Sequence, residues 1–387
     1  MLGVISKKRL LFLGLATVIG LFVLLSAWGF QKISQQREAE AAILDAGGWV
    51  GLAVPGAFPE VAEDFLEDLG FMQIVEISLP DGIDSLKTEH LPSLDHVRFL
   101  YISGDLPASN LSFVEGFNDL QSVNLMEAKI ADGNLQYLPA DIESLSLARA
   151  TFNDRELTYV GKCTQLEELN LNGTQITDQG TGGLPQLRRL RMLEFPGTQI
   201  GDRTLKHLAN LTKLEYLDLT GCKVTDKGMQ HLSGLSAIEL LWLDDTTISD
   251  TGLKSIASLT SLQSLMLGNT SVSEAGLIHL KAMARMEELN LAGTQVADEG
   301  LSNLSNMRNL MILDLNDTLV TDQGLEHLTG LKNLFHLSLS NTQVSDEGIQ
   351  VLQHLPKLER LAVDGTQVTH EGASRLREKL PELEVWR

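Results

Sequence analysis

Leucine and other large apolar residues alternate with polar residues in a regular pattern along most of this chain. Each unit contains an x-Leu-x-Leu-x stretch with apolar side chains at every second position, which predicts a short strand with one buried face. Further apolar residues follow at helical spacing, for example Leu325, Leu328 and Leu331, and predict a short helix. The pattern therefore predicts one strand and one helix in every unit.

The units recur with a fixed period of 24 residues over the C-terminal half of the chain. Their frame is L-x-x-L-x-L-x-x-T-x-[IV]-[TS]-D-x-G-L-x-x-L. A period in this range is typical of a solenoid, in which each unit buries its apolar face only against its neighbours. The anchor positions of the frame are Thr174, Thr198, Cys222, Thr246, Thr270, Thr294, Thr318, Thr342 and Thr366.

The repeats continue upstream with a looser period. The central strand residues Ile77, Leu100, Val123 and Leu145 are separated by 23, 23 and 22 residues. Terminal repeats of a solenoid are usually atypical because they cap it. Counting these units, the sequence predicts a repeat domain over residues 74–387 with 13 parallel strands and a partial closing unit.

The frame resembles the leucine-rich repeat, L-x-x-L-x-L-x-x-[NC]-x-L. Leu166, Leu169 and Leu171 fill its first half, and Thr174 stands where the family has Asn or Cys. The T-x-[IV]-[TS]-D-x-G-L ending resembles that of bacterial membrane-anchored leucine-rich repeat proteins. The resemblance implies an α/β horseshoe, with a parallel sheet on the concave side and short helices on the convex side. It implies no particular activity.

An aspartate recurs at the predicted start of the helices. The Thr or Ser before it suits an N-cap, and the Asp suits the first turn because of the helix dipole. A calcium ladder is the alternative interpretation, which we disfavour because one Asp per repeat supplies too few carboxylates. The recurrent residues are Asp154, Asp178, Asp202, Asp226, Asp250, Asp298, Asp322 and Asp346.

The N-terminus differs in kind from the repeats. Residues 1–9 end in Lys7, Lys8 and Arg9, and residues 10–30 form an apolar run without a charge. This run is long enough to span a bilayer, whereas the apolar region of a cleaved signal peptide is shorter. We expect a cytoplasmic tail over 1–9, a transmembrane helix over 10–30 and an exported repeat domain on the periplasmic or extracellular side. Cleavage after Ser26-Ala27 is the alternative.

Residues 31–73 form a linker and N-terminal cap in this interpretation. Residues 36–44 are rich in helix formers and end at Gly47-Gly48, and residues 61–69 form a second helical stretch.

Charge restricts the class of partner. The chain has a net charge of −21, with 30 Lys and Arg against 51 Asp and Glu. Five of the basic residues lie in residues 1–37, which contain no acid, so the remainder carries −26. Such a domain repels nucleic acid and anionic lipid. The charge favours basic or neutral partners, or it serves only solubility, which is the interpretation we favour.

The sequence contains few candidate catalytic or metal-binding residues. No glycine-rich phosphate loop, H-E-x-x-H, C-x-x-C or G-x-S-x-G motif occurs, so we expect neither catalysis nor a cofactor. Cys163 and Cys222 fall at different repeat positions and are expected to be buried free thiols. A row of histidines on the helical side, expected to be solvated and not to bind metal, comprises His207, His231, His279 and His327.

The concave strand positions are where a solenoid usually binds its partner. Most are polar or small, but one group combines apolar and acidic residues, as protein-binding hot spots do. The alternative is that these side chains only cover one another along the sheet. We expect Trp242 to face outward and to be the strongest candidate. The predicted partner-binding residues are Met192, Glu194, Tyr216, Asp218, Leu240, Trp242, Asp244 and Met266.

Three functions remain open at this point. The first is a membrane-tethered recognition or scaffold protein that binds a protein or peptide ligand, possibly a basic one. The second is an intracellular adaptor of the F-box type in protein degradation, although the sequence offers a membrane span where such an adaptor has a helical module. The third is an enzyme, which the missing motifs disfavour. We favour the first.

Overall fold

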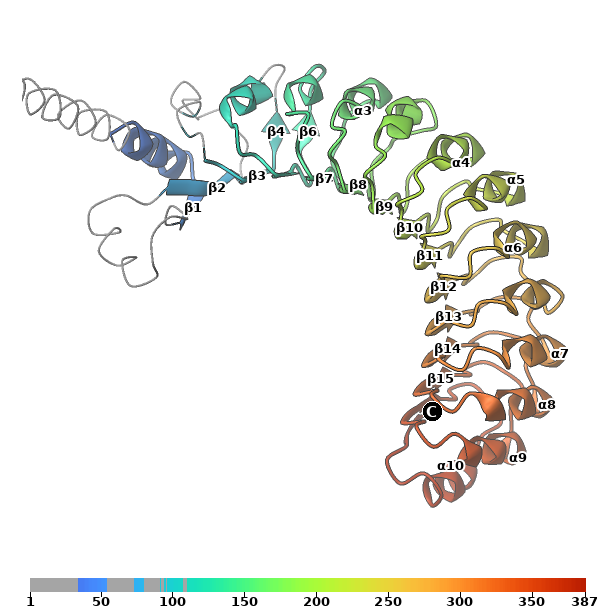
Figure 1. Cartoon of the computed structure of the whole chain (residues 1–387). Helices are drawn as coiled ribbons and strands as arrows, with labels where there is room; N and C mark the ends of the chain where they lie inside the picture. The colour runs from blue at the N-terminus through green and yellow to red at the C-terminus, as the bar shows by residue number, and fades with distance from the viewer. Residues whose placement is uncertain (1–33, 54–72, 80–90, 92–93, 95, 107–109) are drawn as a thin grey trace, which may run out of the picture.

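The protein forms a long arc with strands along its inner side and helices along its outer side (Figure 1). The computed structural model describes residues 34–53, 73–79, 91, 94, 96–106 and 110–387. The predicted tail, the predicted transmembrane helix and the predicted helix over 61–69 lie outside these residues. Within the described ranges, no helix is long and apolar enough to cross a membrane.

The strands of the inner side form one 15-stranded sheet over the described residues. Within it, β2 (Gln73–Leu79) is followed by parallel strands in chain order, and β17 (Glu384–Trp386) is the last strand. A second, two-stranded sheet pairs β4 (Asp105–Leu106) with β6 (Lys129–Ile130). The other parallel strands are β3 (Phe99–Ile102), β5 (Ser122–Asn124), β7 (Ser144–Ser146), β8 (Glu168–Asn170), β9 (Met192–Glu194), β10 (Tyr216–Asp218), β11 (Leu240–Trp242), β12 (Ser264–Met266), β13 (Glu288–Asn290), β14 (Ile312–Asp314), β15 (His336–Ser338) and β16 (Arg360–Ala362).

Residues at the same repeat position pair with each other across the sheet. Leu217 lies opposite Leu193 on one side and Leu241 on the other, and all three side chains are fully buried. The predicted strands and the closing unit are therefore present in the predicted register. Every inward Leu packs against the equivalent residue of the next repeat, so the core runs continuously along the arc.

The sheet has one strand that the sequence did not predict. β1 (Trp49–Ala53) pairs antiparallel with β2, within what we expected to be only a linker and cap. It extends the sheet by covering the outer backbone edge of β2, an edge that would otherwise expose unpaired N–H and C=O groups. The predicted helix before it is confirmed, and it runs over residues 34–45.

The outer side consists of very short helices, as predicted. Several repeats contain a single α-helical turn that tightens into a 3-10 helix. The α-helices are α3 (Asp154–Val160), α4 (Asp202–Leu208), α5 (Asp226–Met229), α6 (Asp250–Ile256), α7 (Asp298–Leu301), α8 (Asp322–Leu325), α9 (Asp346–Ile349) and α10 (His370–Arg377), and the 3-10 helices are η3 (Asn110–Gly116), η4 (Leu135–Tyr137), η5 (Gly180–Gln186), η6 (Gln230–Leu232), η7 (Gly276–Leu280), η8 (Ser302–Leu304), η9 (Glu326–Gly330) and η10 (Gln350–His354).

The predicted N-caps are confirmed in several repeats. The side chain of Thr225 accepts a hydrogen bond from the backbone N–H of Lys227 at the start of α5. Ser249 accepts one from Thr251 at the start of α6. A capping hydroxyl satisfies one of the N–H groups that a helix start leaves unpaired, and it accounts for the recurring Thr or Ser.

The recurrent aspartates also have a second role that the sequence did not predict. Asp202 accepts two hydrogen bonds from Thr225 of the next repeat, from its backbone N–H at 2.8 Å and from its hydroxyl at 2.8 Å. Each such aspartate thereby ties its own helix to the N-cap of the following helix. We call this series the aspartate ladder, and its other pairs are Asp154–Thr177, Asp226–Ser249, Asp250–Ser273, Asp298–Thr321, Asp322–Ser345 and Asp346–Thr369.

The aspartate ladder explains why the repeat frame contains a glycine. A Cβ atom on Gly228 would lie 2.5 Å from Oδ1 of Asp202, which is shorter than any normal contact. The carboxylate of the preceding repeat occupies the space that a side chain would need, so a larger residue here would force a shift. The glycines that face such a carboxylate are Gly180, Gly228, Gly252, Gly276, Gly324, Gly348 and Gly372.

The aspartate ladder departs from its pattern twice in the regular repeats. At the first place Asp178 accepts from the backbone N–H of Gly201, which has no hydroxyl. At the second place both partners change. Glu274 stands in place of the Asp, and Ala297 stands in place of the hydroxyl residue, so α7 has no side-chain cap. We expect the double variant Glu274→Asp/Ala297→Thr to raise the free energy of unfolding by about 1 kcal/mol, the net value of a buried hydrogen bond. Urea denaturation measures it, and Ala297→Thr alone is the control because it lacks the short carboxylate. A double variant no more stable than this control would contradict the structural role of the aspartate ladder.

Candidate functional site

The predicted partner-binding residues lie together on strands β9–β12 and just after them. Tyr216 lies opposite Met192 and Leu240, and Trp242 lies opposite Asp218 and Met266. Asp244 follows β11 by two residues. We call the full set the concave cluster: Met192, Glu194, Tyr216, Asp218, Leu240, Trp242, Asp244 and Met266.

The aromatic pair at the centre of the concave cluster is packed on itself. The rings of Tyr216 and Trp242 meet edge to face, with centroids 5.1 Å apart and an interplanar angle of 76°. Tyr216 is only 8% exposed. Trp242 faces outward, as expected, but its side chain is half-buried. The reason is that Tyr216 of the previous repeat covers its ring.

One polar atom of this pair has no partner. The Nε1 atom of Trp242 is buried and forms no hydrogen bond. A buried donor without an acceptor costs free energy, and native proteins keep few of them. The atom therefore needs a functional or structural reason that packing alone does not supply.

Burial and acidic neighbours act on two carboxylates of the concave cluster. Burial, the charge of Asp218 and the charge of Glu168 together raise the pKa of Glu194. Burial also raises the pKa of Asp244, partly offset by the Gly268 N–H that donates to its Oδ1 at 2.6 Å. Ionised, these carboxylates repel one another at a partly desolvated surface.

Neutral donors hold the carboxylates in place. The side-chain amide of Asn170 donates to Glu194 Oε2 at 3.0 Å, and that of Asn290 donates to Asp244 Oδ1 at 2.9 Å. The backbone N–H of Thr220 donates to Asp218 Oδ1 at 2.9 Å. The repeats on either side thus fix a negative surface through neutral donors, which leave the charge of the carboxylates in place.

The raised pKa of Glu194 predicts a pH-dependent effect of its neutralisation. A carboxyl whose pKa is raised in the folded state contributes full stability below its unfolded pKa and loses it as pH rises through the folded pKa. We therefore expect Glu194→Gln to increase the free energy of unfolding at pH 7 and to change it little at pH 4. Urea denaturation at both pH values checks this. An equal change at the two pH values would show that charge is not the cause.

The concave cluster is therefore partly covered by its own side chains and partly open to a ligand. Tyr216 and Asp218 are buried and cover their neighbours, whereas Met192 is 38% exposed and Leu240, Trp242 and Met266 are partly exposed. The exposed part is an apolar strip beside the carboxylates, which suits a ligand with apolar and basic groups.

A second group of aromatic residues, which sequence reasoning missed, lies near the C-terminus. The rings of His336 and Trp386 meet edge to face at 5.7 Å, and the Arg360 guanidinium lies 5.3 Å from the Phe335 ring. The 24-residue register places these residues on neighbouring strands, so aligning the last repeats would have revealed the group.

The row of histidines lies in the helices of the outer side. His207 bonds through Nδ1 to the Thr181 hydroxyl at 2.9 Å, and burial lowers its pKa. Both cysteines are buried and free, as predicted, and burial raises the pKa of each thiol to about 11. Across the described residues, no three His, Cys, Asp or Glu side chains converge as metal ligands would.

Solved structures of repeat proteins resemble this fold. An internalin of Listeria monocytogenes is similar with a TM-score of 0.68 and 21% identity, covering 81% of this chain and 86% of the internalin. A leucine-rich repeat protein of Leptospira interrogans is similar with a TM-score of 0.59 and 20% identity, covering 77% of this chain and 80% of that one. A TDR receptor has a TM-score of 0.54 and 16% identity, covering 80% of this chain and 59% of the receptor. At these identities the likeness concerns the fold alone.

Sequence comparison identifies the repeats directly. No curated protein sequence matches the chain. A family model described as a leucine-rich repeat region matches residues 183–384, and a leucine-rich repeat model matches residues 162–181. The first match alone covers more than half of the chain, so this protein belongs to the leucine-rich repeat family.

Proposed function

We propose that this protein is a membrane-tethered recognition or scaffold protein whose concave cluster binds a basic segment of a protein or peptide. The fold supports a binding role, since a leucine-rich repeat solenoid offers a broad, preformed surface. The residues 10–30 would form the tether, with the repeats on the exported side.

The observation that carries the proposal is the arrangement of Glu194, Asp218 and Asp244. Holding like charges close together at a partly desolvated surface costs folding free energy, and such arrangements cluster at functional sites. A Lys or Arg side chain of a ligand would remove that cost on binding. The adjoining strip around Met192 and Trp242 would supply the apolar contact that gives an interface most of its affinity.

An affinity capture tests this proposal. The bait is the full-length chain in lipid nanodiscs, exposed to an extract of the cell's own envelope. The test variant is Met192→Ala/Glu194→Gln, and the control is Met311→Ala, which removes a methionine that is 44% exposed against 38% for Met192. We expect the captured partner to bind the test variant at least about tenfold more weakly and the control normally. Equal binding to the test variant and the wild type would exclude the concave cluster as the site.

A further inference from the structure

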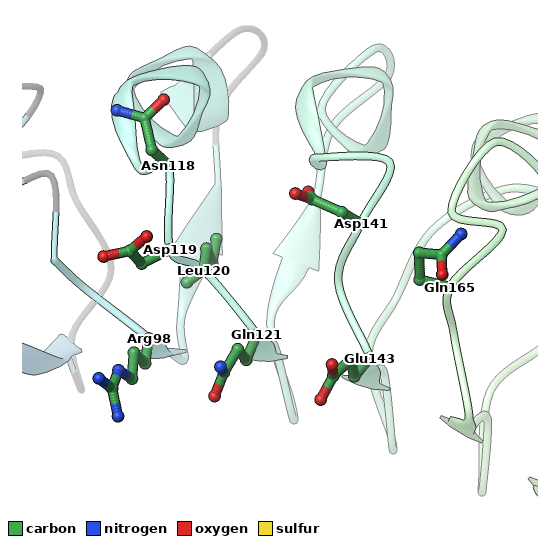
Figure 2. A pocket seen from close by; sticks show the side chains of 8 residues that line it. All are labelled: Arg98, Asn118, Asp119, Leu120, Gln121, Asp141, Glu143 and Gln165. Atoms are coloured by element: carbon green, nitrogen blue, oxygen red, sulfur yellow. The ribbon is translucent and has the colours of Figure 1, made fainter.

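A polar cavity lies where strands β3, β5 and β7 begin, several repeats before the concave cluster. It has a volume of about 440 Å³ and lies between two tiers of side chains (Figure 2). Arg98, Gln121 and Glu143 form the lower tier at the starts of successive strands, and Asp141 lies on the segment above them. The cavity is therefore built from residues of several repeats at equivalent positions.

Backbone hydrogen bonds fix the lower tier. The carbonyl of Gln121 accepts from the N–H groups of Glu143 at 2.8 Å and Ser144 at 3.1 Å. The carbonyl of Glu143 accepts in the same way from Glu167 at 2.7 Å and Glu168 at 3.1 Å. Each residue is thereby held one strand spacing from the next, about 4.8 Å, with its side chain directed away from the core.

One pair of side chains at equivalent positions further along the sheet is hydrogen-bonded. Arg191, at the equivalent position, uses its guanidinium in two hydrogen bonds to Glu215 at 3.0 and 2.8 Å. By contrast, the side chains of Gln121, Glu143 and Gln165 make no hydrogen bond to any part of the chain that the structure describes. The cavity therefore presents unused donors and acceptors at fixed spacing.

A second cavity of about 280 Å³ continues the first toward the concave side. The two share Gln121 and Glu143, and the second adds Ser144 and the ring of Phe99, which is 37% exposed. Because they share two lining residues, the two cavities adjoin as one groove lined by amide, carboxylate and guanidinium groups and one aromatic ring. We call it the edge groove.

We propose that the edge groove binds a neutral oligosaccharide. A sugar hydroxyl both donates and accepts, and pairs of adjacent hydroxyls match planar side chains that offer two polar atoms, as amides, carboxylates and guanidinium do. The exposed Phe99 ring would pack against the apolar C–H face of one sugar ring.

The other ligand classes fit the edge groove less well. Its lining carries Asp119, Asp141, Glu143, Glu167 and Glu168 against Arg98, so it repels anionic glycans. A protein hot spot needs a desolvated apolar pocket, whereas polar side chains dominate this lining. The proposal is independent of the concave cluster, whose residues line neither cavity.

The test uses the full-length chain in lipid nanodiscs and three neutral trisaccharides: maltotriose, cellotriose and chitotriose. Saturation-transfer NMR detects binding at millimolar concentration, and a hexalysine peptide is the competing probe. The test variant is Gln121→Ala. The matched control is Gln263→Ala, at the equivalent repeat position, where the backbone carbonyl accepts from the corresponding pair of N–H groups. Gln263 lines neither cavity of the edge groove.

We expect at least one trisaccharide to bind wild type and Gln263→Ala alike and to bind Gln121→Ala about tenfold more weakly. The hexalysine peptide should not displace it. Three results would overturn the proposal: no trisaccharide binds, both variants lose binding equally, or hexalysine displaces the sugar.

Discussion

Replacing Leu241 by Asp should unfold the central repeats. Leu241 is fully buried in the middle of β11, between Leu217 and Leu265 of the neighbouring strands. A carboxylate at this place has neither water nor a partner, and a fully buried Leu also contributes packing that Asp cannot replace. We expect a loss of more than about 4 kcal/mol, in the range that only buried charges and large cavities reach.

The adjacent residue is the natural control. Trp242 points to the other face of the same strand and is half-buried against Tyr216. Because Trp242→Ala removes an aromatic contact but buries no charge, we expect it to cost about 1–2 kcal/mol and to leave circular dichroism unchanged. If Trp242→Ala disrupted the fold as much as Leu241→Asp, the register of the strand would be wrong.

The consequences of Leu241→Asp should spread along the solenoid. Each repeat is stabilised mainly by its neighbours, so the loss of one repeat exposes the faces of the two beside it. Hydrogen exchange followed by mass spectrometry should therefore show lost protection in β10 and β12 as well as in β11. Unfolding of such arrays need not be two-state, so local exchange is a better measure than one melting temperature.

The register of the sheet could be predicted because the alternation leaves little choice. Shifting one strand by a residue would turn Leu217 and Leu219 out of the core and Asp218 into it. With 24 residues between equivalent positions, the same restriction applies in each regular repeat. This is why strand order, parallel pairing and the buried leucines follow from the sequence.

Contacts between repeats were harder to predict. The frame identified the Asp and the Thr or Ser before it as parts of one helix start, and both have that role. The hydrogen bond from Thr225 to Asp202, however, joins residues 23 positions apart, and only the spacing of neighbouring helices decides whether they meet. β1 was missed for a similar reason, since its partner strand begins 24 positions after its own first residue and pairs in the opposite direction.

Burial within one row of the concave face also escaped prediction. Met192 and Tyr216 occupy the same repeat position, yet Met192 is 38% exposed and Tyr216 is 8% exposed. The difference arises because the large ring of Trp242 packs on Tyr216, whereas the equivalent position beside Met192 is the smaller Asp218. Sequence identifies which residues share a face, but the size of each neighbour decides which of them a ligand can reach.

The second large effect is expected at Glu156. Its side chain accepts hydrogen bonds from the previous repeat, whereas the aspartates of the aspartate ladder accept them from the next repeat. This carboxylate is fully buried and reaches back to the previous repeat, accepting from the Gly133 N–H at 2.6 Å and the Leu135 N–H at 2.9 Å. Two residues earlier, Asp154 reaches forward to Thr177 as the first member of the aspartate ladder. One turn of helix thus joins the irregular N-terminal repeats to the regular ones.

Glu156→Ala should uncouple these two parts of the solenoid. It leaves two backbone N–H groups without an acceptor, and we expect the free energy of unfolding of the N-terminal repeats to fall by about 2–5 kcal/mol. Glu156→Gln keeps one acceptor and the same shape, so it should cost less. Exchange of the Gly133 and Leu135 amides should accelerate strongly in the alanine variant, while the repeats after β9 remain protected. Uniform acceleration along the whole chain would instead mean that the solenoid unfolds as one unit and that Glu156 joins no separable parts.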